Sequence, residues 1–392
     1  MKVLDLSSVV MAPLAARILG DMGADVVKVE PPGGDSLRKI GPMRSSGMGP
    51  MYLNANRNKR SIALDLKSSA GRDALLKLVE SADVLLYNVR PQAMARLGLD
   101  YAACRSRNPA IIHVSACGFG EAGPYAGRPA FDDLIQGLCA LPNLIAQVGD
   151  GNPRYVPMAI VDRYVGVHVA TAILGAYIHK LRTGEGQEIE VPMFETMAEC
   201  VLSDHSGGAM FEPPLGPPGY PRSLAPERHP YQTRDGYVCL MVYTDAHWRT
   251  FLHMVGSELF ETDPRFANLT SRTVHAREIH QMLEEKLHDR TTAEWLAAFE
   301  KADIPAVKLH TLTSLVADEH LQRASLFKWV DHPSEGRIRT MRPTTQWSAT
   351  PPTIWRHAPL LGEHTHEILA ELGYSEKAIS AMLEAGDAVG TG

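Results

Sequence analysis

The chain has 392 residues, of which 45% are hydrophobic and 21% are charged. This length favours two domains, with room for a third, because a single compact core rarely accommodates so many residues. The composition is typical of a folded soluble enzyme and excludes a fibre or a disordered tail. The formal net charge of −6 excludes a general electrostatic attraction to nucleic acid or to an acidic membrane surface. We therefore expect no nucleic acid and no membrane as a partner.

The cysteines give a second set of exclusions. There are five of them, an odd number, and no two have the Cys-X-X-Cys spacing. This pattern argues against a disulfide framework and against a zinc site, and it fits a reducing compartment. The first residues lack the features of a signal peptide, and no apolar run approaches the roughly 18 residues of a membrane-spanning helix. We expect a cytoplasmic protein with no metal and no permanently bound cofactor.

The first 205 residues repeat a strand and helix pattern. Residues 2–8 and 24–30 are short β-branched runs, and they bracket residues 12–23, whose apolar positions follow helical spacing. Residues 74–88 and 108–118 repeat the pattern, and each ends in a nearly all-apolar strand of the kind that is buried on both faces. A helix over 163–181, a strand over 188–193 and a helix over 194–205 are predicted next. The predicted fold class is α/β, with a parallel, Rossmann-like sheet in a large domain over 1–205.

A smaller α/β domain is predicted over residues 235–330. Residues 206–234 are rich in proline and glycine, so they are predicted to be a linker or a loop of the site. The small domain begins with a strand over 235–244 and a helix capped by Asp245, and amphipathic helices follow. Residues 331–344 are predicted to be a return linker. The final helices, within 345–392, would then complete the large domain.

Several common catalytic motifs are absent. The loop after the first strand contains no glycine, so the Gly-X-Gly-X-X-Gly fingerprint of a dinucleotide site is missing from its expected place. The chain also has no phosphate-binding P-loop motif, no His-Glu-X-X-His and no Gly-X-Ser-X-Gly. These absences disfavour an NAD enzyme, a nucleotide-driven motor, a zinc protease and a serine hydrolase.

Basic residues gather where predicted strands end. Any one of them has an ordinary interpretation as a solvated loop charge. Their grouping after successive strands favours a ligand rich in phosphate, because open α/β sheets bind ligands at that edge. They are Arg38, Lys39, Lys59, Arg60, Lys67, Arg90 and Arg96.

Asp162 stands between an apolar run and a long apolar helix, and it has two interpretations. An aspartate at a helix start accepts backbone N–H bonds and is stabilised by the helix dipole, which contributes on the order of 1 kcal/mol. The same helix terminus can keep a partly buried carboxylate ionised and available as a nucleophile. Local sequence does not separate these two roles.

Six segments in order resemble the class III CoA-transferases, the CaiB/BaiF family. This family includes the formyl-CoA and carnitine CoA-transferases and the related α-methylacyl-CoA racemases. The resemblance runs over nearly the whole chain, and six collinear segments are far more specific than any one of them. They are residues 4–38, 54–72, 81–101, 118–137, 161–195 and 358–369.

The resemblance implies a set of site residues and partners. It places the covalent nucleophile of the family at Asp162, and it places Asp132, with Phe131 before it, in the acyl site. It also implies an interlocked homodimer and a CoA thioester as substrate. The CoA-binding positions that it implies are Val9, Val10, Met11, Ala12, Arg38, Leu64, Lys67, Asn88, Val89, Arg96 and Leu97.

The resemblance also implies a reaction. Asp162 would carry CoA between two carboxylic acids through an aspartyl anhydride and an aspartyl-CoA thioester. The alternative is an α-methylacyl-CoA racemase or acyl-CoA isomerase, but that branch has a histidine where this chain has Phe131. For the acceptor acid we consider a basic loop with Arg222, Arg228 and His229, which suits a second carboxylate. Succinyl-CoA is the expected donor, and a short dicarboxylic or sulfinic acid is the expected acceptor.

Overall fold

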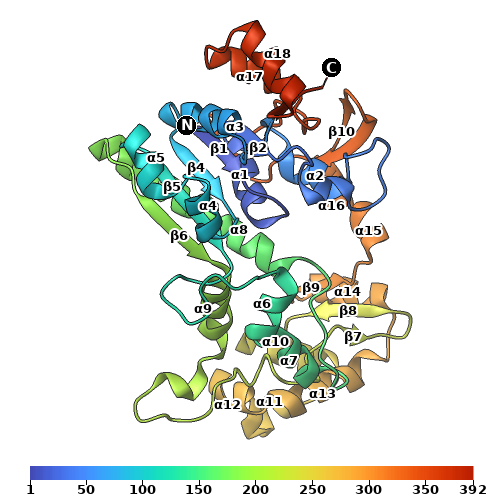
Figure 1. Ribbon diagram of the computed structural model, residues 1–392. Coiled ribbons are helices and arrows are strands. Elements are labelled where there is room, and N and C mark those ends of the chain that lie inside the picture. The colour runs from blue at the N-terminus through green and yellow to red at the C-terminus, as the bar shows by residue number, and fades with distance from the viewer. Residues whose placement is uncertain (392) are drawn as a thin grey trace. The chain divides into compact units, whose positions relative to one another are not determined.

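The computed structural model describes residues 1–391, and the chain forms two compact units (Figure 1). The first unit comprises Met1–Cys139, Val156–Glu199 and the chain from His320 onward. The second unit comprises Ala140–Tyr155 and Cys200–Glu319. Residues 206–234, for which the sequence suggested a separate linker, therefore belong to the second unit. Residues 320–330, assigned by sequence to the small domain, belong to the first.

A seven-stranded sheet forms the centre of the first unit. Its strand order is β12-β3-β2-β1-β4-β5-β6, and all neighbours are parallel except β12, which is antiparallel to β3. The order reverses between β1 and β4, and an open α/β sheet binds ligands at such a switch point. The predicted α/β class with a parallel sheet is confirmed. The strands are β1 Lys2–Leu6, β2 Asp25–Glu30, β3 Lys59–Leu64, β4 Val84–Tyr87, β5 Ile112–Cys117, β6 Glu188–Pro192 and β12 Ala388–Val389.

Helices surround this sheet, and their apolar faces form its core. The central strands are buried along their whole length, as expected for parallel strands with both faces covered. One core cluster joins these strands to α3, α17 and α18, while α1 packs on the long helix α8. The helices of this unit are α1 Met11–Asp21, α2 Pro50–Asn56, α3 Ser69–Glu80, α4 Pro91–Arg96, α5 Tyr101–Arg107, α6 Asp132–Leu138, α8 Ile160–Thr183, α17 Thr365–Glu371 and α18 Glu376–Ala385.

The residues predicted to form a return linker, 331–344, are not without regular structure. These residues form most of an antiparallel hairpin, with β10 at Phe327–His332 and β11 at Gly336–Met341. The polar residues that alternate along it hid the strand signal, because a hairpin with little burial has few apolar positions. Helices α9, Met193–His205, and α16, Glu319–Arg323, span the residues where the chain passes between the units.

The second unit is a small α/β fold. Its sheet has the order β7-β8-β9 and is antiparallel throughout. Its core holds Trp248, Phe251, Trp295 and Phe299. The N-cap of α10 is Thr244, whose hydroxyl accepts from the N–H of His247, so the predicted cap at Asp245 is one residue too late. The elements are α7 Leu141–Val148, β7 Tyr231–Gln232, β8 Tyr237–Leu240, α10 Asp245–Met254, α11 Leu259–Thr262, α12 Leu269–Val274, α13 Ala276–Leu287, α14 Thr292–Lys301, β9 Ala306–Lys308 and α15 Leu312–Val316.

Candidate active site

A cavity of about 350 Å³ opens in the first unit at the carboxyl ends of the parallel strands. Ser8 follows β1, Asn88 follows β4, Gly118 follows β5 and Met193 follows β6, and all four line this cavity. It therefore spans the point where the strand order reverses, which is the usual ligand position of an open α/β sheet. Asp162 and Asp132 also line it. We call it the first-unit cavity.

Asp162 is the third residue of α8, and it is not the N-cap of that helix. The N-cap is Ala159, whose side chain caps nothing. The backbone N–H of Asp162 instead donates to Oδ2 of Asp132 at 2.9 Å. The side chain of Asp132 thus satisfies one of the N–H groups that a helix start leaves without a partner. The capping interpretation of Asp162 is therefore wrong, and capping falls to a carboxylate 30 residues earlier.

The protonation of Asp162 also differs from the expectation. Burial, and secondly the negative charge of Asp132, raise the pKa of Asp162 from its usual 3.8 to about 7, although Arg163 opposes this shift. A helix start alone would have lowered the pKa. Desolvation and a like charge outweigh the helix because both disfavour the ionised form directly. Titration near neutral pH is a common property of groups that take part in catalysis.

The loop between β1 and α1 forms another wall of the cavity. Val9 has a left-handed backbone with φ of 67°, which is unfavourable for a β-branched residue. Its N–H donates to Asp35 at 3.2 Å, while the adjacent Ser8 exchanges two hydrogen bonds with the side chain of Asn88, at 3.0 and 2.7 Å. The loop leads into α1, where the N–H groups of Met11 and Ala12 have no acceptor within the helix. Asn88 and Asp35 thus fix the direction of these free donors.

A buried charge network lies beneath the loop. Lys28 bonds Asp35 at 3.0 Å and the carbonyl of Ser7 at 2.9 Å, and Lys59 bonds Asp5 at 2.7 Å. Both lysine side chains are fully buried. Buried charges are tolerated only when they are paired and hydrogen-bonded. This network therefore ties the β1–α1 loop to β2 and β3.

Close packing of α1 against α8 determines how near the loop comes to Asp162. Gly166 lies four residues after Asp162, on the same face of α8. A Cβ on Gly166 would lie 2.6 Å from the carbonyl oxygen of Met11. Sequence reasoning did not identify this glycine, although its place one turn after the acidic residue of an apolar helix was a usable signal.

The structure brings together seven of the residues that the resemblance implied. Val9, Met11, Asn88, Val89, Phe131, Asp132 and Asp162 all line the first-unit cavity. Val10 and Ala12 are buried in the same loop and helix start, with their side chains in the core.

Five further predicted positions do not line the first-unit cavity. Arg38 is 3% exposed, holds Glu30 through two hydrogen bonds of 2.8 and 2.7 Å, and lies over the ring of Tyr52. Its guanidinium is thus hydrogen-bonded within the protein, and its role in CoA binding stays a prediction. The other four are Leu64, which is buried in β3, Lys67 and Arg96, which are exposed, and Leu97, which is half-buried.

Sequence reasoning missed other residues of the cavity. Arg128 lies over the ring of Tyr125, and Arg90, which the sequence grouped with other basic residues, also lines the cavity. Phe119 and Glu121 come from the same loop after β5. That loop was recognised as part of a family segment, but its individual residues carried no motif. The signal available was position, because β5 ends at Cys117 next to the switch point.

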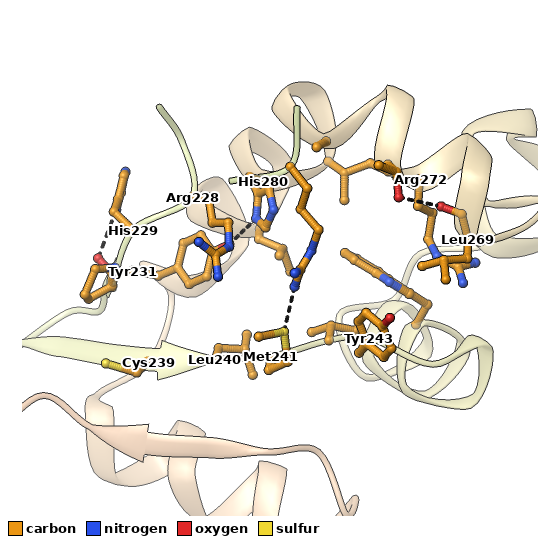
Figure 2. Close-up of a pocket in the computed structure, with 18 residues that line it drawn as sticks. Arg228, His229, Tyr231, Cys239, Leu240, Met241, Tyr243, Leu269, Arg272 and His280 are labelled. Atoms are coloured by element: carbon orange, nitrogen blue, oxygen red, sulfur yellow. Dashed lines mark hydrogen bonds between the residues drawn. The ribbon is translucent and has the colours of Figure 1, made fainter. Parts of the chain in front are cut away.

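Arg222, Arg228 and His229 lie elsewhere. They line a cavity of about 290 Å³ that belongs wholly to the second unit, and we call it the second-unit cavity (Figure 2). Within residues 1–391, no group of three or more His, Cys, Asp or Glu side chains is arranged to hold a metal ion. No helix in that range is long and apolar enough to cross a membrane.

The fold and the first-unit cavity define an α/β enzyme in which a carboxylate that titrates near neutral pH stands at a ligand-binding sheet edge. The model of CoA-transferase family III matches residues 1–365, and the chain belongs to this family. It is thus a class III CoA-transferase, as the sequence predicted. The chain is 32% identical to the succinate–glutarate CoA-transferase of Agrobacterium fabrum, over 96% of each chain.

Two further comparisons support this family assignment. The succinyl-CoA:mesaconate CoA-transferase of Haloarcula hispanica is 31% identical, over 95% of this chain and 96% of its own. The crystal structure of a CAIB/BAIF family protein from Brucella suis superposes with a TM-score of 0.78 at 28% identity, over 95% of this chain and 98% of that one. The similarity therefore covers both units of the fold.

Proposed function

We propose that this enzyme moves CoA from succinyl-CoA to a short dicarboxylic acid, with Asp162 as the covalent carrier. The observation that carries the proposal is the carboxylate of Asp162, which lies in the first-unit cavity with a pKa of about 7. Its protonated form is uncharged, and its ionised form is a nucleophile that is poorly solvated and therefore reactive.

The proposed reaction needs no proton and no outside energy source. The ionised Asp162 attacks the carbonyl carbon of the donor thioester, which forms a mixed anhydride and expels CoA thiolate. The thiolate attacks the aspartyl carbonyl of this anhydride, forms an aspartyl-CoA thioester and releases the donor acid. The carboxylate of the acceptor acid attacks that thioester, which gives a second anhydride and thiolate. The thiolate attacks the acyl carbonyl of the second anhydride, so the new acyl-CoA leaves and Asp162 regains its carboxylate.

The surroundings of Asp162 support this sequence of steps. Each attack places negative charge on a carbonyl oxygen, and the N–H groups of Met11 and Ala12 at the start of α1 supply donors for it. An anhydride hydrolyses easily, so the cavity must exclude water during turnover. The loop residues Val9 and Met11, together with Asn88 and Val89, would hold the pantetheine end of CoA. Coenzyme A enters as a substrate and not as a resident cofactor.

The proposal that the exchanged acids are dicarboxylic rests on the names of two relatives and on the positive charge of two arginines in the first-unit cavity. The names of the Agrobacterium and Haloarcula relatives contain succinate and succinyl-CoA, each with a second dicarboxylic acid. In the first-unit cavity, Arg90 and Arg128 have no carboxylate partner among the described residues, and either suits the free carboxylate of a succinyl group. Phe131 and Asp132 would border the acyl chain there.

No specific observation favours the racemase alternative. No histidine lines the first-unit cavity within the described residues. Phe131 occupies the position at which the racemase branch has a histidine. Incubating an α-methylacyl-CoA in deuterated water tests this directly, since a racemase incorporates deuterium at the α carbon and a transferase does not. The homodimer stays a prediction, which the mass of the protein in solution tests.

Trapping of the intermediate tests the carrier. Hydroxylamine should inactivate the enzyme only when succinyl-CoA is present, because it attacks the aspartyl anhydride or thioester and leaves a hydroxamate. Peptide mass spectrometry should locate this modification at Asp162. Asp133→Asn is the matched control, because Asp133 is exposed and outside the cavity lining. A fully active Asp162→Asn enzyme, or a hydroxamate at another residue, would remove Asp162 from this role.

A further inference from the structure

The second-unit cavity is lined by cations and contains no acidic side chain among its described lining residues. Arg222, Arg228 and Arg272 contribute guanidinium groups, and His229 and His280 stand with them. Protein surfaces usually balance such a group with carboxylates, because like charges in proximity repel each other. Asp245 pairs with Arg272, and Glu284 lies 3.6 Å from His229, but Arg222 and Arg228 have no carboxylate partner among the described residues. This excess of positive charge favours an anionic ligand.

The arginines have unused hydrogen-bonding capacity. Arg272 is 7% exposed, and its Nε is buried with no hydrogen-bond partner among the described residues. Its two terminal nitrogens are occupied, one by the carbonyl of Phe266 at 3.0 Å and one by Asp245 at 2.5 Å. Leaving a buried donor without an acceptor costs about 1–3 kcal/mol, so such atoms commonly mark a site for a ligand or a water.

Arg222 has no oxygen acceptor among the described residues. It is half-buried, and its guanidinium reaches the sulfur of Met241 at 2.8 Å and approaches the ring of Tyr243 at 5.5 Å. A thioether is a weak acceptor, and neither contact neutralises the charge. Arg228 is exposed at the rim and has no carboxylate partner among the described residues.

Much of the rest of the lining is apolar. Leu240 at the end of β8, Val242, Trp248 of α10, and Ile279 and Leu283 of α13 form a hydrophobic wall. This wall suits a short carbon chain better than a phosphate or a sugar, because either of those would leave the apolar side chains in contact with water. Figure 2 shows Arg228 and Arg272 well separated from each other, above the segment that carries Leu240 and Met241. Cations at two ends of an apolar space suit an acid with a carboxylate at each end.

His280 has a supporting role in this arrangement. Its Nδ1 is hydrogen-bonded to the hydroxyl of Tyr231. Burial, followed by the charges of Arg222 and Arg228, lowers the pKa of His280 to about 4. The imidazole is therefore neutral at physiological pH, and it fixes Tyr231 without adding to the positive charge. The depressed pKa also reports the positive field that the two arginines create.

We propose that the second-unit cavity binds a short dicarboxylic acid, with one carboxylate at Arg222 and Arg228, the other at the Nε of Arg272, and the carbon chain along the apolar wall. The choice of this acid rests on the proposed function, since it is the class of acid that the reaction exchanges. The binding site itself belongs to the second unit alone, and Asp162 lines a different cavity.

Calorimetric titration of the full chain, without CoA, tests the site. Glutarate should bind, and pentanoate, which has the same number of carbons and one carboxylate, should bind at least about tenfold more weakly, because a charge-assisted hydrogen bond is lost. Arg222→Gln and Arg228→Gln should each weaken glutarate about tenfold or more. Arg234→Gln is the matched control, because Arg234 is exposed in the same unit, pairs with Glu294 and does not line the cavity.

Arg272→Lys removes the buried Nε while keeping a positive charge near Asp245, and it should also weaken glutarate. If a lowered thermal midpoint shows that the Arg272→Lys variant folds poorly, the Arg222→Gln and Arg228→Gln variants decide the result. Unchanged glutarate affinity in Arg222→Gln and Arg228→Gln overturns the proposal. So does adenosine 3′,5′-bisphosphate binding with the same arginine dependence while glutarate does not bind, since the site is then one for the phosphates of CoA.

The same titration on Asp162→Asn separates this inference from the proposed function. In that variant, glutarate binding should still depend on Arg222 and Arg228 as it does in the unaltered protein. If the unaltered protein has no transferase activity but glutarate binding depends on Arg222, the proposed function fails and the cavity assignment stands. If transfer is intact and the arginines have no effect on binding, the cavity assignment fails alone.

Discussion

The backbone N–H of Asp162 donates to a carboxylate oxygen of Asp132 at 2.9 Å, so two acidic residues 30 positions apart meet in the first-unit cavity. This contact has an electrostatic consequence as well as a structural one. Asp132 supports the start of α8, and its negative charge opposes ionisation of Asp162. The same residue thus positions the proposed nucleophile and, together with burial, raises the pH at which it ionises.

The rate should follow the ionisation of Asp162. Because the nucleophile is the carboxylate and its pKa is raised to about 7, kcat/KM should rise close to tenfold per pH unit below about pH 7 and level off above it. Initial rates with succinyl-CoA across roughly pH 5 to 9 measure this profile. A rate that is already constant at about pH 5 would mean that Asp162 ionises at its ordinary pKa or is not the nucleophile.

Asp132→Asn should shift this profile toward lower pH. The substitution removes the negative charge that raises the pKa of Asp162, while an amide oxygen can still accept the N–H at the helix start. The midpoint of the rise should fall, by less than a full return to about 4 because burial is the larger cause. Asp133→Asn, on the exposed side of α6, is the control and should leave the midpoint in place. An equal shift in both variants would assign the effect to general surface charge.

Asp162→Asn should stabilise the protein at alkaline pH. The pKa of Asp162 is higher in the folded chain than its usual value, so its contribution to stability is fully present below about pH 4 and is lost as pH rises through about 7. An asparagine does not titrate, so the variant should gain about 1–3 kcal/mol over the unaltered protein near pH 8 and much less near pH 5. Thermal midpoints at the two pH values measure the difference. A pH-independent gain would point to packing instead of ionisation.

The sequence predicted the parallel sheet because its strands are short apolar runs next to helical patterns, and that information is local. It also placed Asp162 correctly near the start of the long helix. It could not predict the raised pKa of Asp162, because the effect comes from burial and from Asp132, which approaches only in the folded chain. Local sequence suggested a lowered pKa from the helix start alone.

Arg38 is a second residue whose environment the sequence could not predict. A basic residue in a glycine-rich loop after a strand resembles a free phosphate-binding group. In the fold, Glu30 at the end of β2 turns toward it and Tyr52 of α2 covers it, so the charge is paired and buried. Similarly, nothing in residues 140–155 indicated that they belong to the second unit, because membership in a unit depends on tertiary contacts.

Gly166→Ala should reduce activity by displacing the start of α1 from Asp162. The added Cβ would lie 2.6 Å from the carbonyl oxygen of Met11, which cannot move without moving the helix start and its free N–H groups. We expect kcat to fall about tenfold or more. Gly175→Ala in the same helix is the matched control, because its Cβ would have no neighbour within 4 Å. That change should stabilise α8 by about 0.5–1 kcal/mol and leave kcat unaltered. Equal loss of activity in both variants would contradict the packing argument.

Lys59→Met should destabilise the fold and disturb the β1–α1 loop. The ammonium group of Lys59 is fully buried and donates to Asp5 at 2.7 Å, to the carbonyl of Pro13 at 2.9 Å and to Asn56 at 2.9 Å. Removing it leaves Asp5 buried without this partner, which typically costs about 3–5 kcal/mol. Arg107→Met is the control, since its pair with Glu80 is about half exposed on both sides and contributes about 0–1 kcal/mol. Denaturant unfolding measures both, and a loss no larger for Lys59→Met than for Arg107→Met would mean that the buried network does not hold the strand ends together.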